Sequence, residues 1–279
     1  MRLAANLSLL FTELPLIERF QAAADAGFKT VEIQFPYNES VHDLVQAKKQ
    51  AGVQVCLINV PASDLMEGGE GLACVPGKEA EFEDALKQAC IYANALDVKV
   101  LNVLSGRCLD ESKLSEYMAV FKKNLLKAAT VMTKYKILVT FEALNIKDMP
   151  GFLIHHTEQM LDILAELNHS NLKMQYDIYH MQIMDGNVDE VLEHHANMIG
   201  HIQFADVPGR GEPLSGNLNF KRIFEDIQQS QYKGYVSAEY RPSGGDTKAS
   251  LYWMAQFDLA GLSGCIHKET LKNEYNKSL

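Results

Sequence analysis

The sequence has few cysteines and no long apolar run. Its five cysteines are widely spaced and none belongs to a C-x-x-C pair, which argues against a zinc knuckle and against a disulfide framework. No segment approaches the roughly 18 consecutive apolar residues of a membrane-spanning helix. The first residues, MRLAANLSLLFTEL, contain only a short apolar run and an early Glu13, so they are not typical of a signal peptide. We therefore expect a cytoplasmic protein that does not bind membranes.

Positive charge is also scarce. The chain has 26 lysine and arginine residues against 36 aspartate and glutamate residues, so its formal net charge is −10. A chain with this charge repels phosphate backbones, which argues against a nucleic-acid partner. The remaining composition, with 47% hydrophobic and 22% charged residues, is that of an ordinary globular protein and excludes a disordered chain, a collagen and a coiled coil.

Short apolar segments rich in β-branched residues alternate along the chain with segments whose apolar residues recur at helical spacing. Helical patterns such as LIERFQAAADAG and HDLVQAKKQAG end at glycine, which closes helices by adopting a left-handed conformation. Strands that alternate with helices pair in parallel through right-handed crossovers, and eight such units close most simply into a (β/α)8 TIM barrel. The expected strands cover residues 3–7, 30–34, 53–59, 99–104, 136–142, 172–177, 200–204 and 235–240.

One α/β domain is expected for nearly the whole chain. At 279 residues the chain fits a single barrel of about 250 residues, and no linker rich in proline, glycine or serine divides it. We assign residues 1–262 to the barrel and residues 263–279 to a polar C-terminal tail. A doubly wound open sheet is the competing architecture, but no G-x-G-x-x-G motif follows the first strand.

Two of the expected loops are longer than a barrel requires. Residues 60–78 follow the third strand and residues 145–156 follow the fifth, and both lie on the face where barrel active sites form. We take residues 60–78 as a candidate lid because Gly68, Gly69 and Gly71 permit hinge motion. The alternative is that these residues form only a long surface connection.

Oxygen-bearing side chains close the last four expected strands: Glu142, Asp177, Gln203 and Glu239. The carboxyl ends of neighbouring barrel strands stand about 5 Å apart, so these side chains can converge on one point. Three carboxylates in one place repel one another unless a cation lies among them, and oxygen donors suit a hard dication such as Mg²⁺ or Mn²⁺. One acidic residue at a strand end is often only a helix cap, but four such residues after apolar strands favour a metal site.

Several segments together carry a family resemblance: AANLSLLFTELP, EIQFPY, LACVPGKEAEF, FEALN, DIYHMQIMDGN, HIQFADVPGRGEP, GNLNF and AEYRP. Over residues 3–253 the chain resembles the hydroxypyruvate isomerase family, which belongs to the xylose-isomerase-like barrels. The resemblance implies a divalent metal, Mg²⁺ or Mn²⁺, held by Glu142, Asp177, Gln203 and Glu239. It also implies that the two glutamates move protons. Many related sugar epimerases carry histidine at the third ligand position, so Gln203 agrees with the hydroxypyruvate isomerase branch.

The activity that this resemblance implies is an isomerisation of the aldose–ketose type, between hydroxypyruvate and tartronate semialdehyde. A proton moves between C3 and C2 through an enediol, and a metal chelated by the two oxygens would stabilise their charge as a Lewis acid. We expect Glu142 and Glu239 on opposite sides of the metal. One would remove the proton and the other would shuttle protons to oxygen or carbon, and the sequence leaves open which does which.

Three further residues are expected near the substrate. His180, three residues after Asp177, can donate a hydrogen bond to a substrate oxygen whatever its charge. Three carboxylates, one dication and a substrate carboxylate leave a net negative charge, and Arg210 in PGRGEP can bind a carboxylate with both arms of its guanidinium. Glu32 ends the second strand, and we expect it to orient a neighbour or the substrate rather than bind the metal. The structural alternatives are a plain hydrogen bond for His180, a solvated loop for Arg210 and a loop cap for Glu32.

Three other functions fit parts of the sequence. Isomerisation of a longer sugar acid such as a 2-oxo-tetronate would use the same metal and glutamates, and nothing in the sequence indicates the length of the pocket. A metal nuclease acting at abasic DNA would need more histidine and aspartate ligands and a basic groove, which the net charge of −10 disfavours. A non-catalytic sugar-acid binding protein would not require all four ligands. The expected partner is therefore a small hydroxy-oxo acid, and the oligomeric state, a homo-oligomer included, stays open.

Overall fold

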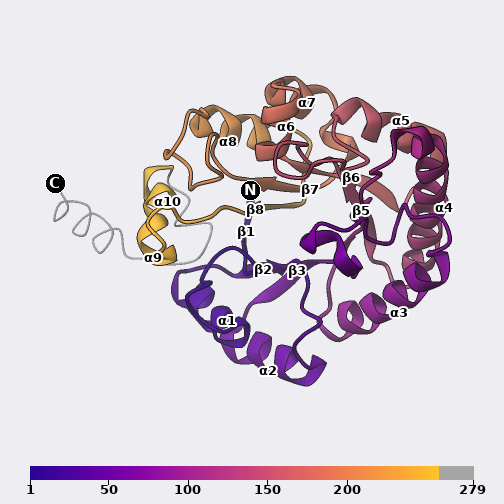
Figure 1. Cartoon of the computed structure of the whole chain (residues 1–279). Helices are drawn as coiled ribbons and strands as arrows, with labels where there is room; N and C mark the ends of the chain where they lie inside the picture. Colours follow the sequence, from indigo (N-terminus) through magenta and orange to yellow (C-terminus); the bar gives the residue numbers. More distant parts are fainter. Residues whose placement is uncertain (258–279) are drawn as a thin grey trace.

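Eight parallel strands form a closed barrel with helices around it (Figure 1). The computed structural model describes residues 1–257. Neighbours in sequence are neighbours in the barrel, and β1 closes it by pairing with β8. The strands are β1 (Arg2–Asn6), β2 (Thr30–Ile33), β3 (Gln54–Asn59), β4 (Val100–Asn102), β5 (Leu138–Glu142), β6 (Leu172–Asp177), β7 (Ile199–Phe204) and β8 (Tyr235–Ala238). The predicted (β/α)8 fold is confirmed, and the expected tail over residues 263–279 lies outside the described residues.

Strand register brings the polar strand ends to one edge of the barrel. Asn6 pairs with Glu32 across β1 and β2, and Asp177 pairs with Gln203 across β6 and β7. The register shifts next to Glu32 in the β2–β3 pair and next to Gln175 in the β6–β7 pair. Such irregularities are common at barrel rims beside active sites. The two shifts therefore lie on the strands that carry two of the expected site residues.

Each main helix buries one face against the barrel. In α4 (Leu114–Thr133), Tyr117, Phe121, Leu125 and Ala128 are buried at the spacing of one helical face. The expected glycine stop is present at Gly52, which has φ 67° and closes α2. The other helices are α1 (Leu16–Asp25), α2 (Val41–Ala51), α3 (Glu79–Ala95), α5 (Thr157–Leu167), α6 (Ile178–Met184), α7 (Val188–His194), α8 (Phe220–Gln229), α9 (Thr247–Ser250) and α10 (Tyr252–Gln256).

The barrel interior has an apolar layer and a polar layer. Nearer the amino ends of the strands, a buried cluster contains Ala4, Cys56, Leu57, Val100 and Tyr235. At the carboxyl ends, buried polar side chains replace the apolar ones: Asn6, Glu32, Asn59, Asn102, Glu142, Asp177, Gln203 and Glu239. Burying polar groups costs free energy unless they are paired, so this second layer marks the place where polar side chains have a use.

The candidate lid is packed against neighbouring loops. It contains a short 3-10 helix, η1 (Ser63–Glu67), whose Leu65 lies in a buried cluster with Leu104, Leu144 and Phe152. These partners follow β4 and β5, so the lid covers that side of the barrel mouth, and its expected hinge motion stays a prediction. Within residues 1–257, no helix has both the length and the apolar character needed to cross a membrane.

Candidate active site

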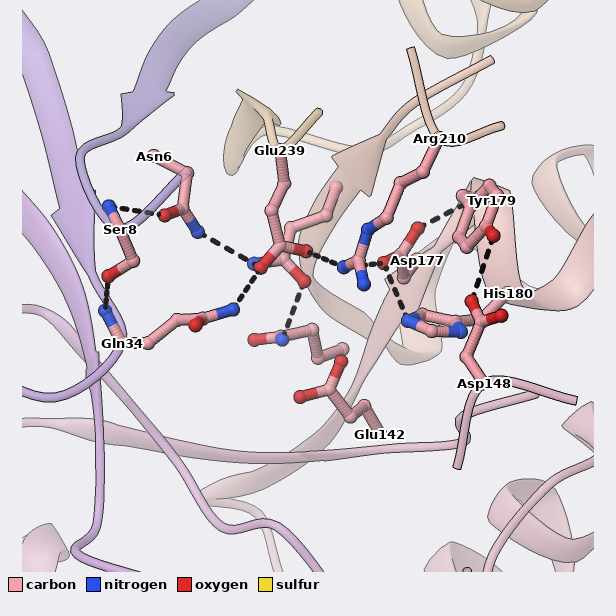
Figure 2. A network of polar contacts seen from close by, with 12 residues as sticks. Asn6, Ser8, Gln34, Glu142, Asp148, Asp177, Tyr179, His180, Arg210 and Glu239 are labelled. Carbon is pink, nitrogen blue, oxygen red and sulfur yellow. Dashed lines mark hydrogen bonds and ion pairs between the residues drawn. The ribbon is translucent and has the colours of Figure 1, made fainter. Parts of the chain in front are cut away.

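The four expected ligands lie together at the carboxyl-end mouth of the barrel. Glu142 ends β5, Asp177 ends β6, Gln203 lies in β7, and Glu239 directly follows β8. All four are buried, with exposed fractions of 1% to 5%. Figure 2 shows Asp177 and Glu239 on either side of the guanidinium of Arg210, with Glu142 nearby. The structure therefore brings the charged residues of the expected site into one network.

Arg210 reaches this network from the loop after β7. Its Nη2 lies 3.1 Å from Oε2 of Glu239 and 3.6 Å from Oδ2 of Asp177. Its guanidinium carbon lies 5.2 Å from the centre of the Tyr179 ring. Burial lowers the pKa of Arg210, but the attraction of Glu239 and Asp177 outweighs burial and raises the pKa. The cation that charge counting demands is therefore present, and its contact with a substrate carboxylate stays a prediction.

Asp206 holds the loop that carries Arg210, a role that the sequence analysis missed. Asp206 is fully buried, and its carboxylate accepts backbone N–H groups from four loop residues at 2.8–3.0 Å: Val207, Leu214, Gly216 and Leu218. The N–H of Arg241 also donates to the carbonyl oxygen of Arg210 at 2.8 Å. An aspartate directly before a segment rich in glycine and proline is a typical turn signal, and this pattern could have identified Asp206.

His180 has one defined proton position. The backbone N–H of Asn145 donates to its Nδ1 at 3.1 Å, so Nδ1 carries no proton and a neutral ring must carry its proton on Nε2. Burial lowers the pKa of His180 to about 4, although Asp177 acts in the opposite direction. Nε2 lies 3.5 Å from Oδ2 of Asp177. His180 therefore presents a neutral N–H donor beside the expected ligands.

Glu142 is a buried carboxylate whose hydrogen-bond partners are neutral amides. Its Oε1 accepts a hydrogen bond from Nδ2 of Asn102 at 2.7 Å, and the same nitrogen lies 3.2 Å from Oδ1 of Asn59. Burial and then the nearby Asp177 raise the pKa of Glu142 to about 8, while hydrogen bonds from Gln175 and Asn102 oppose the rise. Ionising Glu142 therefore costs free energy, and a cation at the mouth would lower that cost.

Glu239 is held by amides on one side and by a cation on the other. Its Oε1 accepts hydrogen bonds from Nδ2 of Asn6, at 3.1 Å, and from Nε2 of Gln34. Its Oε2 pairs with Arg210. Burial raises the pKa of Glu239 well above its ordinary value, with Arg210 opposing the rise and Asp177 adding to it. Asn6 was not among the expected site residues, because polar strand ends are common in barrels, and Gln34 was missed.

Glu32 is enclosed inside the barrel. Its Oε1 accepts hydrogen bonds from Nδ2 of Asn6 and Nε2 of Gln203, each at 2.7 Å, and its Oε2 lies 2.5 Å from Nε2 of His201. Burial raises the pKa of Glu32, but His201 and the amide donors outweigh burial and lower it. Glu32 thus contacts neighbours, as one of its two expected roles requires, and a contact with substrate stays a prediction. His201 was missed, although strand alternation places it on the same face as Gln203.

The donor set at the mouth fits a hard dication. Glu142, Asp177 and Glu239 offer carboxylate oxygens and Gln203 offers an amide oxygen, which are the ligands that Mg²⁺ and Mn²⁺ accept. Oδ2 of Asp177 is buried and has no hydrogen-bond partner among residues 1–257. Nη2 of Arg210 and Nε2 of His180 lie 3.6 Å and 3.5 Å away, too far for good hydrogen bonds, so a closer cation would stabilise this oxygen. The residues present therefore fit the metal that the family resemblance implies.

A second group of ligand-type atoms lies deeper in the barrel. In the described part of the chain, Glu32, Cys56 and His201 offer atoms within 4.8 Å of one another, whereas the carboxylates at the mouth lie farther apart. Glu32 and His201 already share a hydrogen bond, and burial raises the pKa of the Cys56 thiol well above its usual range. A thiol that resists ionisation is a poor metal ligand. We therefore keep the metal expectation at the mouth.

Comparison with known proteins identifies the family. A model of the xylose isomerase-like TIM barrel matches residues 20–257. The hydroxypyruvate isomerase of Escherichia coli (strain K12) is 40% identical over 254 residues, which cover 91% of this chain and 98% of that protein. The 2-oxo-tetronate isomerase of Cupriavidus necator is 36% identical over 256 residues, which cover 92% of this chain and 98% of that protein. The chain belongs to the xylose isomerase-like TIM barrel family.

Solved structures agree with this assignment. A crystal structure described as an AP endonuclease of family 2 from Brucella melitensis is 37% identical, with a TM-score of 0.87, and the match covers 92% of this chain and 98% of that one. A D-psicose 3-epimerase from Clostridium cellulolyticum H10 shares the fold, with a TM-score of 0.71 at 18% identity over 90% of each chain. The curated relatives named hydroxypyruvate isomerase and 2-oxo-tetronate isomerase make the chain an isomerase of the ketose or sugar-acid type that acts on a small molecule.

Proposed function

We propose that the chain is a metal-dependent isomerase that interconverts hydroxypyruvate and tartronate semialdehyde. The observation that carries the proposal is the buried group of Glu142, Asp177, Gln203 and Glu239 at one mouth, where Oδ2 of Asp177 accepts no hydrogen bond from the described residues. The relative named hydroxypyruvate isomerase, 40% identical to this chain, supports the reaction. These four residues would hold Mg²⁺ or Mn²⁺, which when bound supplies Lewis-acid stabilisation of negative charge on two substrate oxygens.

Glu142 and Glu239 are the proposed proton carriers. They come from β5 and from the end of β8, so they can approach a substrate at the mouth from different sides. One carboxylate takes the proton from C3 of hydroxypyruvate and returns it to C2, while the other moves the hydroxyl proton from the C3 oxygen to the C2 oxygen. Asn102 and Asn6 donate to one oxygen of Glu142 and Glu239 respectively, which orients each carboxylate.

His180 and Arg210 are the proposed substrate-binding residues. The proton on Nε2 of His180 can be donated to a substrate oxygen, because Nδ1 is occupied by the N–H of Asn145. Arg210 is the proposed anchor for the substrate carboxylate. Its Nε is buried and has no hydrogen-bond partner within the described residues, so this donor can be used by a ligand.

A second candidate is the isomerisation of a 2-oxo-tetronate at the same site. The 36% identical relative named 2-oxo-tetronate isomerase favours it, and the same glutamates and metal would serve a four-carbon substrate. A nuclease activity, which the description of one solved structure names, is disfavoured by the net charge of −10. A non-catalytic binding protein is disfavoured by the complete set of ligand and proton-carrying side chains.

An NMR assay tests both isomerase candidates. The protein is incubated in D₂O with hydroxypyruvate or with a four-carbon 2-oxo acid, each with EDTA and then with added Mg²⁺ or Mn²⁺. We expect conversion to stop in EDTA, to return with metal, and to place deuterium on the product carbon, because a glutamate exchanges its proton with solvent. Faster conversion of the four-carbon acid would select the second candidate. No conversion of either acid in the presence of metal would refute the isomerase proposal.

A further inference from the structure

Glu32 and His201 form a buried pair that spans the barrel interior. The two residues come from β2 and β7, which are far apart in the sequence, and both have an exposed fraction of 0%. Nε2 of His201 lies 2.5 Å from Oε2 of Glu32, and the other oxygen of Glu32 takes two amide donors. Both oxygens of the carboxylate thus accept hydrogen bonds from protein donors.

The pair determines how the amide of Gln203 is turned. A carboxylate oxygen only accepts hydrogen bonds, so the group that faces Oε1 of Glu32 at 2.7 Å must be the NH₂ of Gln203. The opposite orientation would place two acceptor oxygens in contact without a proton between them. With its nitrogen held by Glu32, the amide oxygen of Gln203 must point elsewhere, and it accepts a hydrogen bond from Nε2 of Gln175 at 2.8 Å.

The same oxygen of Glu32 also holds Asn6. Nδ2 of Asn6 lies 2.7 Å from Oε1 of Glu32 and 3.1 Å from Oε1 of Glu239, and its Oδ1 accepts the N–H of Ser8 at 2.8 Å. Asn6 therefore has both ends occupied and joins Glu32 to Glu239. Oε1 of Glu32 thus orients the proposed metal ligand Gln203 directly. It also orients the proposed proton carrier Glu239 through Asn6.

We propose that Glu32 and His201 are a positioning pair, which keeps the amide oxygen of Gln203 turned away from Glu32, where it would be available to a cation at the mouth, and holds Asn6 against Glu239. His201 occupies the second oxygen of Glu32, so that the first is left to the two amides. This inference rests on the proposed function, because it takes Gln203 as a metal ligand. Hydrogen bonds that orient a ligand from behind typically change metal affinity or activity by about 10- to 100-fold when they are lost.

Two substitutions of Glu32 separate orientation from simple packing. Glu32→Leu fills the same space without an acceptor, so the NH₂ of Gln203 loses its partner and the amide is free to turn. Glu32→Gln keeps an oxygen for both amides, and its own NH₂ can donate to His201, whose Nδ1 has no partner among the described residues to oppose a change of tautomer. We expect the Kd for Mn²⁺ to rise at least tenfold in Glu32→Leu and to stay within about threefold in Glu32→Gln.

A matched control removes a buried hydrogen bond elsewhere. The hydroxyl of Tyr232 donates to the carbonyl oxygen of Tyr235 at 2.6 Å, at the first residue of β8 and so at the end of the barrel opposite the mouth. Tyr232→Phe should lower Tm as Glu32→Leu does, but leave the Kd for Mn²⁺ unchanged. A folded Glu32→Leu variant that binds Mn²⁺ within about threefold of the wild-type Kd would overturn the proposal.

A measurement on the metal-free wild-type protein keeps the inference testable if Glu32→Leu does not fold. The side-chain NH₂ signals of Gln203 are assigned in ¹⁵N-glutamine-labelled protein by their loss in Gln203→Asn. We expect them to exchange with solvent at least tenfold more slowly than those of the exposed Gln50, because Glu32 holds them inside the barrel. Exchange as fast as that of Gln50 would overturn the proposal. If the wild-type protein does not bind Mn²⁺, the proposed metal chemistry fails, and the exchange measurement still decides the orientation of Gln203.

Discussion

The two halves of the barrel mouth carry different kinds of polar group. Strands β5–β8 and the loop after β7 supply the charged groups: Glu142, Asp177, Glu239 and Arg210. Strands β1–β4 end in a different set: Asn6, Glu32, Asn59 and Asn102. The one carboxylate of this second set, Glu32, has both oxygens on protein donors. The charged set can therefore take part in catalysis, whereas the second set can hold the charged side chains in place.

Neutral amides suit this supporting role. Asn102 donates to Glu142 at 2.7 Å and Asn6 donates to Glu239 at 3.1 Å. A lysine in either position would also orient the carboxylate, but it would cancel charge that a metal dication requires, and its positive charge would lower the pKa of a proton carrier. An asparagine is neutral, so it neither cancels this charge nor lowers the pKa of the proton carrier to the same extent. We therefore expect substitutions in the charged half to cause large losses of activity and substitutions in the amide half to cause smaller losses.

The largest loss is expected for Glu239→Gln. The substitution keeps the shape of the side chain but removes a group that accepts protons, and positioned acid–base groups contribute about 10²- to 10⁴-fold to rates. We expect kcat for hydroxypyruvate to fall by that factor at saturating Mn²⁺, measured by NMR. Glu212→Gln is the control, because Glu212 is also buried but binds only Ser243 in the described structure. Near-wild-type turnover in a metal-bound Glu239→Gln protein would remove Glu239 from the acid–base role.

A smaller loss, confined to substrate binding, is expected for Arg210→Ala. A hydrogen bond to a charged group contributes about 1.5–3 kcal/mol, so KM for hydroxypyruvate should rise about 10- to 100-fold in steady-state kinetics. Arg241→Ala is the matched control, since the exposed side chain of Arg241 is on the neighbouring loop and only its backbone N–H contacts Arg210. A rise of severalfold or less would mean that Arg210 serves the carboxylates and does not anchor the substrate.

The amide half should respond more weakly. Asn102→Ala removes the donor to Glu142, and we expect kcat/KM to fall about three- to tenfold, in line with the loss of one partly compensated hydrogen bond. Asn59→Ala should have a smaller effect, because Asn59 reaches Glu142 only through Asn102. Steady-state kinetics of the two variants give the order. Equal losses from Asn102→Ala and Glu239→Gln would contradict the division of the mouth into charged and supporting halves.

The fold could be predicted from the sequence because the sequence patterns that indicate its strands and helices are local. Strand and helix periodicities and the glycine at position 52 act over a few residues, and all eight expected strands are present. The observed strand bounds differ from the expected ones where tertiary contacts outweigh the local pattern. The expected strand over residues 99–104 is only Val100–Asn102, because Leu104 turns away to pack against Leu65 of the lid.

The charged half of the site could also be predicted, because acidic residues follow several apolar strands, although a single one can be only a helix cap, as Asp177 also is for α6. The supporting half could not be predicted. Asn6, Gln34 and His201 contribute through partners more than 160 residues away in the sequence, and these contacts exist only once the barrel closes. Neutral amides are ordinary residues at strand ends, so no local pattern distinguishes them. The orientation of each amide follows from its partners rather than from its own position.

The smallest predicted effect concerns Asp185, a carboxylate outside the mouth. Oδ2 of Asp185 accepts the N–H of Thr157 at 2.9 Å, and Oδ1 lies 2.6 Å from Nδ1 of His156. Burial raises the pKa of Asp185, but the hydrogen bonds from Thr157 and His156 outweigh burial and lower it. This direction is opposite to that of Glu142. Asp185 should therefore contribute to stability, whereas Glu142 is a proposed proton carrier.

A lowered pKa in the folded state means that the unfolded chain binds the proton more tightly. The stabilisation by Asp185 is then present above the pKa of an unfolded aspartate, about 3.9, and is lost as the pH falls through the lower folded value. We expect Asp185→Asn to reduce the free energy of unfolding by about 1 kcal/mol at neutral pH, the worth of one hydrogen bond, with kcat unchanged. Urea unfolding of both proteins should show this difference shrinking below about pH 4. A difference that is constant with pH would mean that the charge of Asp185 does not stabilise the fold.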